Sequence, residues 1–306
     1  MKQLSLRLVV CGLMLALMLT ACSALSPTSS TPTPIPSGMV DVGEYRLYFK
    51  CSGQGSPTVI LESGGGGDST YWATVIDGIE GTTRVCAYDR ANLGRSDSVR
   101  GPRTFQDMTR DLQVLLENAH IGGPYILVGW SMGGMLVRVF ADQHPGDVVG
   151  IVLVDSAHPD MGLRLLAGLP PESANEPANI RFLRQFFTWM SNSDGSSFMN
   201  VEGVDTQASN QQARIARPLG DLPLVVISQS PNIPGLGLSM ITSKGPLPAE
   251  TDARLRQIWQ DLQSELAGLS SNTTRLTAQG GHMIPIEQPE LVVQAIAELV
   301  NEAGGQ

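Results

Sequence analysis

From residue 44 onward, short apolar runs alternate with longer helical windows, and this alternation limits the fold more than any other feature. The helical windows span residues 104–120, 132–145 and 289–304, and Thr104 is placed to cap the first. The strand-like runs are EYRLYFKCS, TVILES, TRVCAYD, YILVGW, IVLVDS, LPLVVIS and TRLTAQ. Apolar strands separated by helices must be covered on both faces. The pattern therefore predicts a mostly parallel sheet between two helical layers.

One interval interrupts this rhythm. No convincing strand lies between Asp155 and Leu222, but an aromatic helical stretch, IRFLRQFFTWM, occupies residues 180–190. Roughly sixty residues are too many for a simple crossover between strands. We therefore expect residues 158–221 to form a lid over the sheet edge where ligands bind. Most aromatic side chains of this stretch should form the insertion's own core, with one or two facing a substrate.

The stretch Gly129-Trp130-Ser131-Met132-Gly133 has the GxSxG pattern and lies where a predicted strand turns into a predicted helix. A nucleophile in such a turn needs small neighbours, because its backbone is strained and the chain passes close to it. The turn also presents the hydroxyl at a helix N-terminus, where partial positive charge favours a developing anion. The string alone is common, but the strand before it and the helix after it indicate that Ser131 is a nucleophile.

With this motif, the chain resembles the α/β-hydrolase superfamily from about Met39 to its C-terminus, and three further stretches carry the resemblance. VILESGGGGDS occupies the place of the family's histidine–glycine pair and oxyanion loop. CAYDRANLGRSD resembles its DxRGxGxS turn, with Asn92 in place of the first glycine. AQGGHMIPIEQPELVVQAI resembles its histidine loop and final helix. The resemblance implies an eight-stranded, mostly parallel sheet with a helical lid after strand six, and a core comprising residues 39–157 and 222–306.

The glycine run after the second apolar strand is the expected oxyanion loop. Two backbone N–H groups must point at the oxygen of a tetrahedral intermediate, and in this family the residue after the nucleophile, here Met132, supplies one. Gly65 is the candidate for the second because it follows the serine–glycine pair, and Gly66 is the next choice. A phosphate cradle has little support, because no GK[ST] follows the run. A merely flexible loop is the remaining alternative, and the sequence suggests no firm role for Glu62.

The chain has four histidines, and one of them is expected to be the catalytic base. His282 follows two glycines after the last predicted strand, where the superfamily has its base. It would accept the Ser131 proton and return it to the leaving group. His120 and His144 lie at helix ends and are expected at the surface. His158 is near the start of the predicted lid and could line the site, but a local hydrogen-bonding role is favoured.

A histidine base also needs an acceptor that fixes its tautomer and orientation. The stretch LPLVVISQSPNIPG, residues 222–235, contains no carboxylate, although the superfamily often places its acid in this loop. Asp155 ends the preceding predicted strand, where some members of the superfamily have their acid, and we assign it that role. The alternative is that Asp155 only caps the following turn; Asp252 and Asp261 lie on a predicted helix and suit the role less. Ser131, Asp155 and His282 keep the family's chain order.

Two cysteines, Cys51 and Cys86, fall in the predicted core without a CxxC or metal-like spacing. The usual strand order of the superfamily places their two strands side by side, which implies a possible disulfide. Two unlinked buried thiols are the alternative. A disulfide is compatible with a location outside the cytoplasm.

The stretch MKQLSLRLVVCGLMLALMLTAC, residues 1–22, has the features of an export signal, because Lys2 and Arg7 precede an apolar segment that ends in small residues and Cys22. It resembles a bacterial lipoprotein signal, in which the cysteine becomes the lipidated N-terminus. A plain secretory signal or an uncleaved anchor is the alternative. Residues 1–21 would be removed, and the Ser-, Thr- and Pro-rich residues 22–38 would form an extended tether. We expect an exported protein held by the lipid on Cys22 at the outer face of the bacterial cell membrane.

Composition narrows the class of partner. Two of the 20 Lys and Arg residues lie in the signal, so 18 face 29 Asp and Glu residues in the exported chain. Such an acidic balance argues against nucleic-acid binding. We expect a small-molecule acyl substrate, no cofactor and no metal ion.

These features together predict a carboxylesterase-like serine hydrolase, which acts on an ester or related acyl substrate through a Ser131 acyl-enzyme with water as the acceptor. Acyltransferase, peptidase and carbon–carbon hydrolase activities stay open, because a fold does not determine the substrate. A different class is a surface-tethered binding protein that kept the fold but lost turnover.

Replacing Cys22 with alanine tests the expected anchor. The variant should incorporate no radioactive palmitate and should leave the membrane fraction, because the acylated thiol is lost. Labelling and fractionation of bacteria that produce the full chain measure both effects, with Ser23→Ala as the matched control. A Cys22→Ala protein that stays bound to the membrane as its parent does would contradict a lipid anchor.

Overall fold

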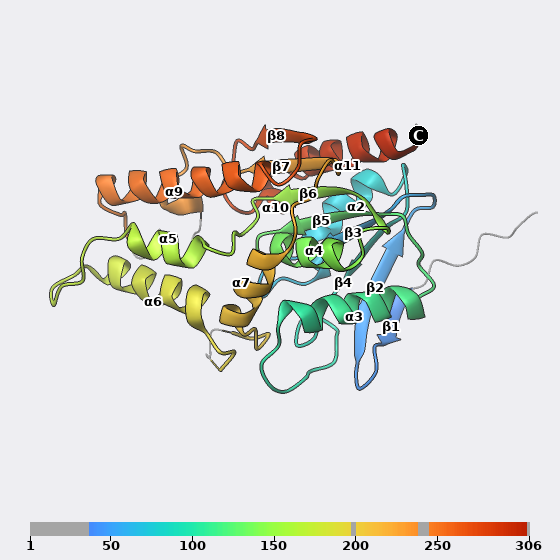
Figure 1. The fold of residues 1–306 in the computed structure, drawn as a ribbon, viewed down its shortest axis with the longest axis horizontal. Coiled ribbons are helices and arrows are strands. Elements are labelled where there is room, and N and C mark those ends of the chain that lie inside the picture. The colour runs from blue at the N-terminus through green and yellow to red at the C-terminus, as the bar shows by residue number, and fades with distance from the viewer. Residues whose placement is uncertain (1–36, 197–199, 238–244, 305–306) are drawn as a thin grey trace, which may run out of the picture. The chain divides into compact units, whose positions relative to one another are not determined.

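The computed structural model describes residues 37–196, 200–237 and 245–304, which contain one eight-stranded sheet in the order β1-β2-β4-β3-β5-β6-β7-β8 (Figure 1). β2 pairs antiparallel with both β1 and β4, and every other neighbouring pair is parallel. This confirms the predicted mostly parallel sheet. The strands are β1 (Ser37–Asp41), β2 (Arg46–Ser52), β3 (Thr58–Glu62), β4 (Val85–Tyr88), β5 (Tyr125–Trp130), β6 (Val148–Val154), β7 (Leu224–Ser228) and β8 (Thr273–Thr277).

Helices cover both faces of this sheet (Figure 1). On one face, α2 (Ala73–Ile79) and α11 (Pro289–Gly304) share an apolar core with β3, β5, β6 and β7. On the other face lie α3 (Phe105–Asn118), α4 (Met132–Gln143) and α9 (Ala249–Ala267), whose apolar side chains form a second core. Thr104 caps α3 as predicted: its hydroxyl accepts from the Asp107 N–H while the Asp107 carboxylate accepts from the Thr104 N–H, a capping box.

The insertion between β6 and β7 contains α5 (Met161–Ala167), α6 (Ala178–Asn192) and α7 (Thr206–Ile215). The aromatic stretch lies on α6, as the pattern predicts. Leu183 and Phe187 are buried in the core that the insertion shares with α4 and α9, whereas Phe186 and Trp189 are half-buried and stack on each other. The shorter elements are η1 (Ser69–Trp72), η2 (Pro234–Gly237) and α10 (Ile284–Glu287).

A disulfide joins Cys51 of β2 to Cys86 of β4 in the structure. The two residues are direct partners in the antiparallel ladder between these strands. They are 35 residues apart in sequence, and closing a loop of that length in the unfolded chain stabilises the fold by about 4 kcal/mol in the chain-entropy model. The bridge thus fastens the antiparallel edge of the sheet to its parallel centre.

The predicted export segment lies outside the described residues, which begin at Ser37. The expectations for residues 1–21, for Cys22 and for nearly all of the tether therefore have no structural counterpart. Among the residues that the structure describes, no helix has the length and apolar content needed to cross a bilayer.

Candidate active site

Ser131 lies between the end of β5 and the start of α4, in a backbone conformation that few residues other than glycine adopt. Its φ is 55° and its ψ is −122°. The Ser131 N–H donates to the Val154 carbonyl at 3.1 Å, and its own carbonyl accepts from the N–H groups of Gly134 (3.0 Å) and Ala157 (2.9 Å). These bonds hold the strained turn in place and present the hydroxyl at the N-terminus of α4.

The glycines around this turn are required by close backbone contacts. A Cβ on Gly129 would lie 2.6 Å from the Gly133 carbonyl oxygen. A Cβ on Gly133 would lie 2.5 Å from the carbonyl oxygen of Glu62 and 2.6 Å from that of Ser63. The first turn of α4 therefore packs directly on the chain that leaves β3. A side chain at Gly133 would separate the two, and a side chain at Gly129 would overlap the first turn of α4 itself.

His282 connects Ser131 to Asp155. Its Nε2 lies 3.0 Å from the Ser131 Oγ, and its Nδ1 lies 2.6 Å from the Asp155 Oδ2. The structure thus brings together the three residues expected from the sequence, which follow β5, β6 and β8. With the proton on Nδ1, the ring donates to the carboxylate and presents an acceptor nitrogen to the serine hydroxyl.

Asp155 is fully buried, and both of its carboxylate oxygens have partners. Oδ1 accepts from the Gln229 backbone N–H at 3.0 Å and from the Trp259 indole N–H at 2.9 Å. Gln229 belongs to the 222–235 stretch that contains no carboxylate, so that loop contributes a donor to the acid instead of the acid itself. The sequence did not identify either partner, because a backbone N–H and a single tryptophan on α9 belong to no motif.

The two candidate oxyanion donors, Gly65 and Met132, lie on segments that contact each other next to Ser131. A Cβ on Gly65 would lie 3.6 Å from the Met132 Sδ, so the glycine loop and the start of α4 are in contact. Within the described part of the chain, no acceptor bonds to the N–H of Gly65 or of Met132. The Gly66 N–H, the other choice from the sequence, donates to the Glu202 Oε1 at 2.7 Å and is therefore occupied. The geometry favours Gly65.

Glu62, which had no role in the sequence, is fully buried at the end of β3. Its carboxylate pairs with the Arg90 guanidinium and accepts from the Tyr88 hydroxyl. Burial raises the pKa of Glu62, and the positive charge of Arg90 opposes that shift. The buried charged side chains of Glu62 and Arg90 are thus in contact with the glycine loop, because Arg90 also donates to the Gly64 carbonyl.

The other histidines make contacts away from this hydrogen-bonded chain. His158 Nδ1 accepts from the Asp160 N–H at 3.1 Å. Burial lowers the pKa of His158, and the charges of Asp160 and Glu265 oppose the change. His144 caps the C-terminus of α4, and His120 follows the end of α3. His158 thus has the local hydrogen-bonding role that the sequence favoured.

The alternative acids also have partners elsewhere. Asp252 accepts from the Gly235 N–H and from Arg256, and Asp261 accepts from Gln257. Neither bonds to a histidine among the described residues. In the same residues, no group of three His, Cys, Asp or Glu side chains is arranged to hold a metal ion.

Comparison with known proteins identifies a matching family model and several similar proteins. A family model described as "alpha/beta hydrolase fold" matches residues 57–301. The chain is 28% identical over 302 residues to "Probable transporter efuK" of Hormonema carpetanum, covering 87% of this chain and 43% of that protein. It is 26% identical over 251 residues to "Uncharacterized protein YqjL" of Bacillus subtilis (strain 168), covering 81% and 85%. The chain thus spans less than half of the first relative and most of the second.

Solved structures with similar folds include a thermophilic esterase from Thermogutta terrifontis. The TM-score is 0.56 at 21% sequence identity, and the match covers 87% of this chain and 98% of that one. At this level of identity the likeness concerns the fold.

Adding one methyl group at Gly133 should break the contact between α4 and the chain leaving β3. Gly133→Ala is expected to lower the free energy of unfolding by about 3 kcal/mol, because the new Cβ would overlap two carbonyl oxygens. Urea unfolding followed by circular dichroism measures the change. Gly146→Ala is the matched control, since nothing lies within 4 Å of its Cβ position. Equal stability of the two variants would contradict this packing.

Proposed function

The chain belongs to the α/β-hydrolase superfamily, and from that premise we propose that it is a serine hydrolase that cleaves a carboxylic ester or related acyl substrate through a covalent Ser131 acyl-enzyme. One observation carries the proposal: the unbroken hydrogen-bonded chain from Asp155 through His282 to the Ser131 hydroxyl. The strained turn presents this hydroxyl beside the N–H groups of Gly65 and Met132, which have no acceptor among the described residues, and this supports the proposal further.

In the first half of the reaction, the Ser131 Oγ attacks the substrate carbonyl while its proton passes to the His282 Nε2. The carbonyl oxygen becomes an anion, which the N–H groups of Gly65 and Met132 would stabilise. The tetrahedral intermediate collapses as the C–O bond to the leaving group breaks, and the imidazolium returns its proton to that oxygen. The products are an alcohol and an acyl group bound to Ser131.

In the second half, water replaces the alcohol. His282 takes a proton from the water as the water attacks the acyl carbonyl. The bond between the acyl carbon and the Ser131 Oγ then breaks, the imidazolium returns its proton to that oxygen, and the carboxylic acid leaves. Throughout both halves, Asp155 stabilises the imidazolium without taking up its proton. Its second oxygen is anchored by Gln229 and Trp259, so the carboxylate is fixed in the orientation that the ring requires.

We assign the insertion, residues 158–221, the role of a lid over the site. Two features support this role. Glu202 of the insertion reaches the loop after β3 and accepts from the Gly66 N–H. The stacked pair Phe186 and Trp189 on α6 is only half-buried and so leaves apolar surface on the insertion, and we propose that this surface contacts an apolar acyl group.

We further propose that the enzyme acts outside the cytoplasm, attached by a lipid on Cys22. The residue pattern before Ser37 supports this location, and the disulfide between Cys51 and Cys86 is chemically compatible with it. An acyl substrate would then be met at the cell surface.

A fluorophosphonate probe tests the mechanism, because it reacts much faster with an activated serine than with an ordinary hydroxyl group. The probe should label the protein and should not label Ser131→Ala. Asp155→Asn should keep the fold, since an amide oxygen still accepts from Gln229 and Trp259, yet lower kcat for an ester substrate about 10⁴-fold. Probe labelling followed by peptide mass mapping, and assays with a panel of acyl esters and aminoacyl amides, measure these effects.

Three results would count against parts of the proposal. A folded protein that the probe does not label would favour a binding protein that has lost turnover. Near-normal activity in Asp155→Asn would show that the acid lies elsewhere. A panel on which amides are cleaved faster than esters would make the protein a peptidase on the same residues.

A further inference from the structure

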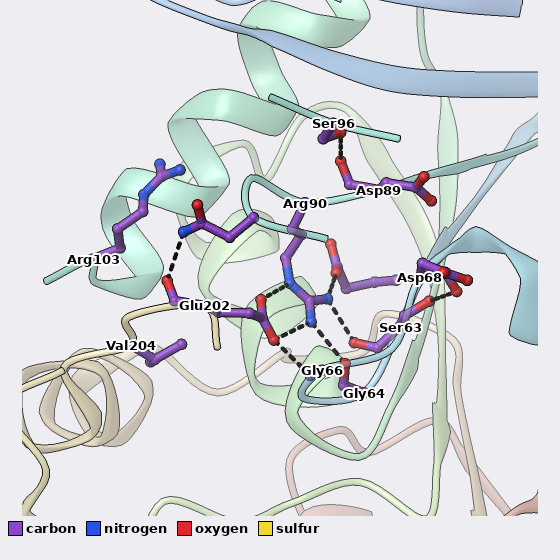
Figure 2. Close-up of polar contacts among 12 residues, drawn as sticks. Ser63, Gly64, Gly66, Asp68, Asp89, Arg90, Ser96, Arg103, Glu202 and Val204 are labelled. Atoms are coloured by element: carbon purple, nitrogen blue, oxygen red, sulfur yellow. Dashed lines mark hydrogen bonds and ion pairs between the residues drawn. The ribbon is translucent and has the colours of Figure 1, made fainter. Parts of the chain in front are cut away.

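A buried ion-pair network joins the insertion to the expected oxyanion loop (Figure 2). Arg90, which follows β4, is at the centre. Its Nε donates to Glu202 Oε2 at 2.6 Å, and its Nη2 donates to Glu202 Oε1 at 2.9 Å. Arg90 is 3% exposed, Glu202 2% and Glu62 0%. Glu202 belongs to the insertion, more than a hundred residues further along the chain, so this contact is a tertiary connection between two parts of the fold.

Arg90 has no donor left for a ligand. An arginine side chain has five N–H bonds, and here each has its own acceptor. Two go to Glu202 and one to Glu62, and the last two go to the carbonyls of Ser63 (2.8 Å) and Gly64 (2.7 Å). Arg90 therefore does not bind a substrate carboxylate. Arg90 instead holds the backbone of the glycine loop through the Ser63 and Gly64 carbonyls, and we call this set of bonds the clamp.

The clamp determines which way the loop's peptide groups face. A trans peptide places the carbonyl and the following N–H on opposite sides. Because the Gly64 carbonyl points to Arg90, the Gly65 N–H points away from the network, and no described residue accepts from it. One residue later, the Gly66 N–H donates to Glu202. The carbonyl of Gly64 and the N–H of Gly66 are thus both held, and the Gly65 N–H lies between these two fixed points.

The segment that carries Glu202 is itself fastened to the core. The Arg103 N–H donates to the Gly203 carbonyl at 2.7 Å, and the Arg103 carbonyl accepts from the Asp205 N–H at 2.8 Å. Asn92, which replaces the first glycine of the DxRGxGxS pattern, has a φ of 72° and donates from its side chain to the Glu202 carbonyl at 3.4 Å. Asparagine tolerates this left-handed conformation, so the substitution keeps the turn and adds a contact to the insertion.

We propose that Glu202 is a positioning residue for catalysis, which acts through Arg90 and Gly66 to hold the Gly65 N–H in the oxyanion hole. The inference rests on the proposed serine hydrolase function and adds a residue from the insertion to it. The oxyanion hole is complete only while the segment around Glu202 is docked on the core. Glu62 has the matching role on the other side, since it holds Arg90 in place from β3.

Substitution of Glu202 tests this role. Glu202→Ala removes the acceptor for Gly66 and leaves Arg90 paired with Glu62, so no charge is left buried alone. We expect the rate of phosphonylation of Ser131 by a fluorophosphonate to fall about 100-fold, the order of losing one oxyanion donor. With a short-chain p-nitrophenyl ester, kcat should fall by a similar factor and KM should change less than about 3-fold, because the hole forms bonds mainly in the transition state.

Glu202→Gln is the second variant, in case the alanine variant does not fold. The NH2 group of the glutamine cannot accept. In place of Oε2 it would face the Arg90 Nε, and in place of Oε1 it would face both the Gly66 N–H and the Arg90 Nη2. At least one hydrogen bond is therefore lost in either orientation of the amide. We expect a loss of about 10-fold or more in the same rate. Glu176→Gln is the matched control. It breaks a part-buried ion pair with Arg184 inside the insertion, and neither residue contacts the glycine loop.

The outcomes separate the two proposals. Slow phosphonylation of the Glu202 variants with a normal rate for Glu176→Gln supports the positioning role. If the unsubstituted protein is labelled and both Glu202 variants react at the same rate as it does, the positioning role is overturned and the serine hydrolase proposal stands. Equal losses in Glu202→Ala and Glu176→Gln also overturn it, because they would reflect general loosening of the insertion. If the unsubstituted protein is not labelled at all, both proposals fall.

Discussion

The left-handed backbone of Ser131 is the constraint on which the rest of the site depends. A serine at a φ of 55° is strained by itself and persists only where its surroundings fix it. Here the surroundings are the buried strands β5 and β6 and the glycines that let α4 approach the chain leaving β3. The same contacts that hold the strain also bring the nucleophile against the glycine loop. The contacts that hold the strained backbone of Ser131 therefore also position the groups that the proposed chemistry needs.

Buried charge is the second organising feature, and it has a cost. Two carboxylates, Glu62 and Glu202, share the single positive charge of Arg90 in a water-excluded part of the fold. Removing charged groups from water is unfavourable unless nearly every hydrogen bond is satisfied. The cluster meets that condition through the backbone of the glycine loop and the Tyr88 hydroxyl. Such a network makes the loop's conformation specific, which is what an oxyanion site needs.

Strand and helix periodicities predicted the sheet and the main helices, and the GxSxG motif predicted Ser131, because these signals are local. The resemblance to the superfamily implied His282 and Asp155. The sequence did not predict β1, whose five residues show no alternating apolar pattern, or α2. It could not predict that Trp259 and Gln229 hold Asp155, because those contacts depend on how distant elements pack. Glu62 remained unexplained for the same reason: its partner Arg90 is shared with Glu202, which lies in the insertion, the part of the chain with the fewest recognisable motifs.

A crystal structure of the protein after reaction with a fluorophosphonate would test the central claim most directly. The phosphonyl group mimics the tetrahedral intermediate on the serine. We expect phosphorus bonded to the Ser131 Oγ, with one phosphonyl oxygen about 2.7–3.1 Å from the backbone nitrogens of both Gly65 and Met132. Glu202 and Arg90 should still be paired behind the loop. An adduct on another residue, or a phosphonyl oxygen bound by neither nitrogen, would contradict the account.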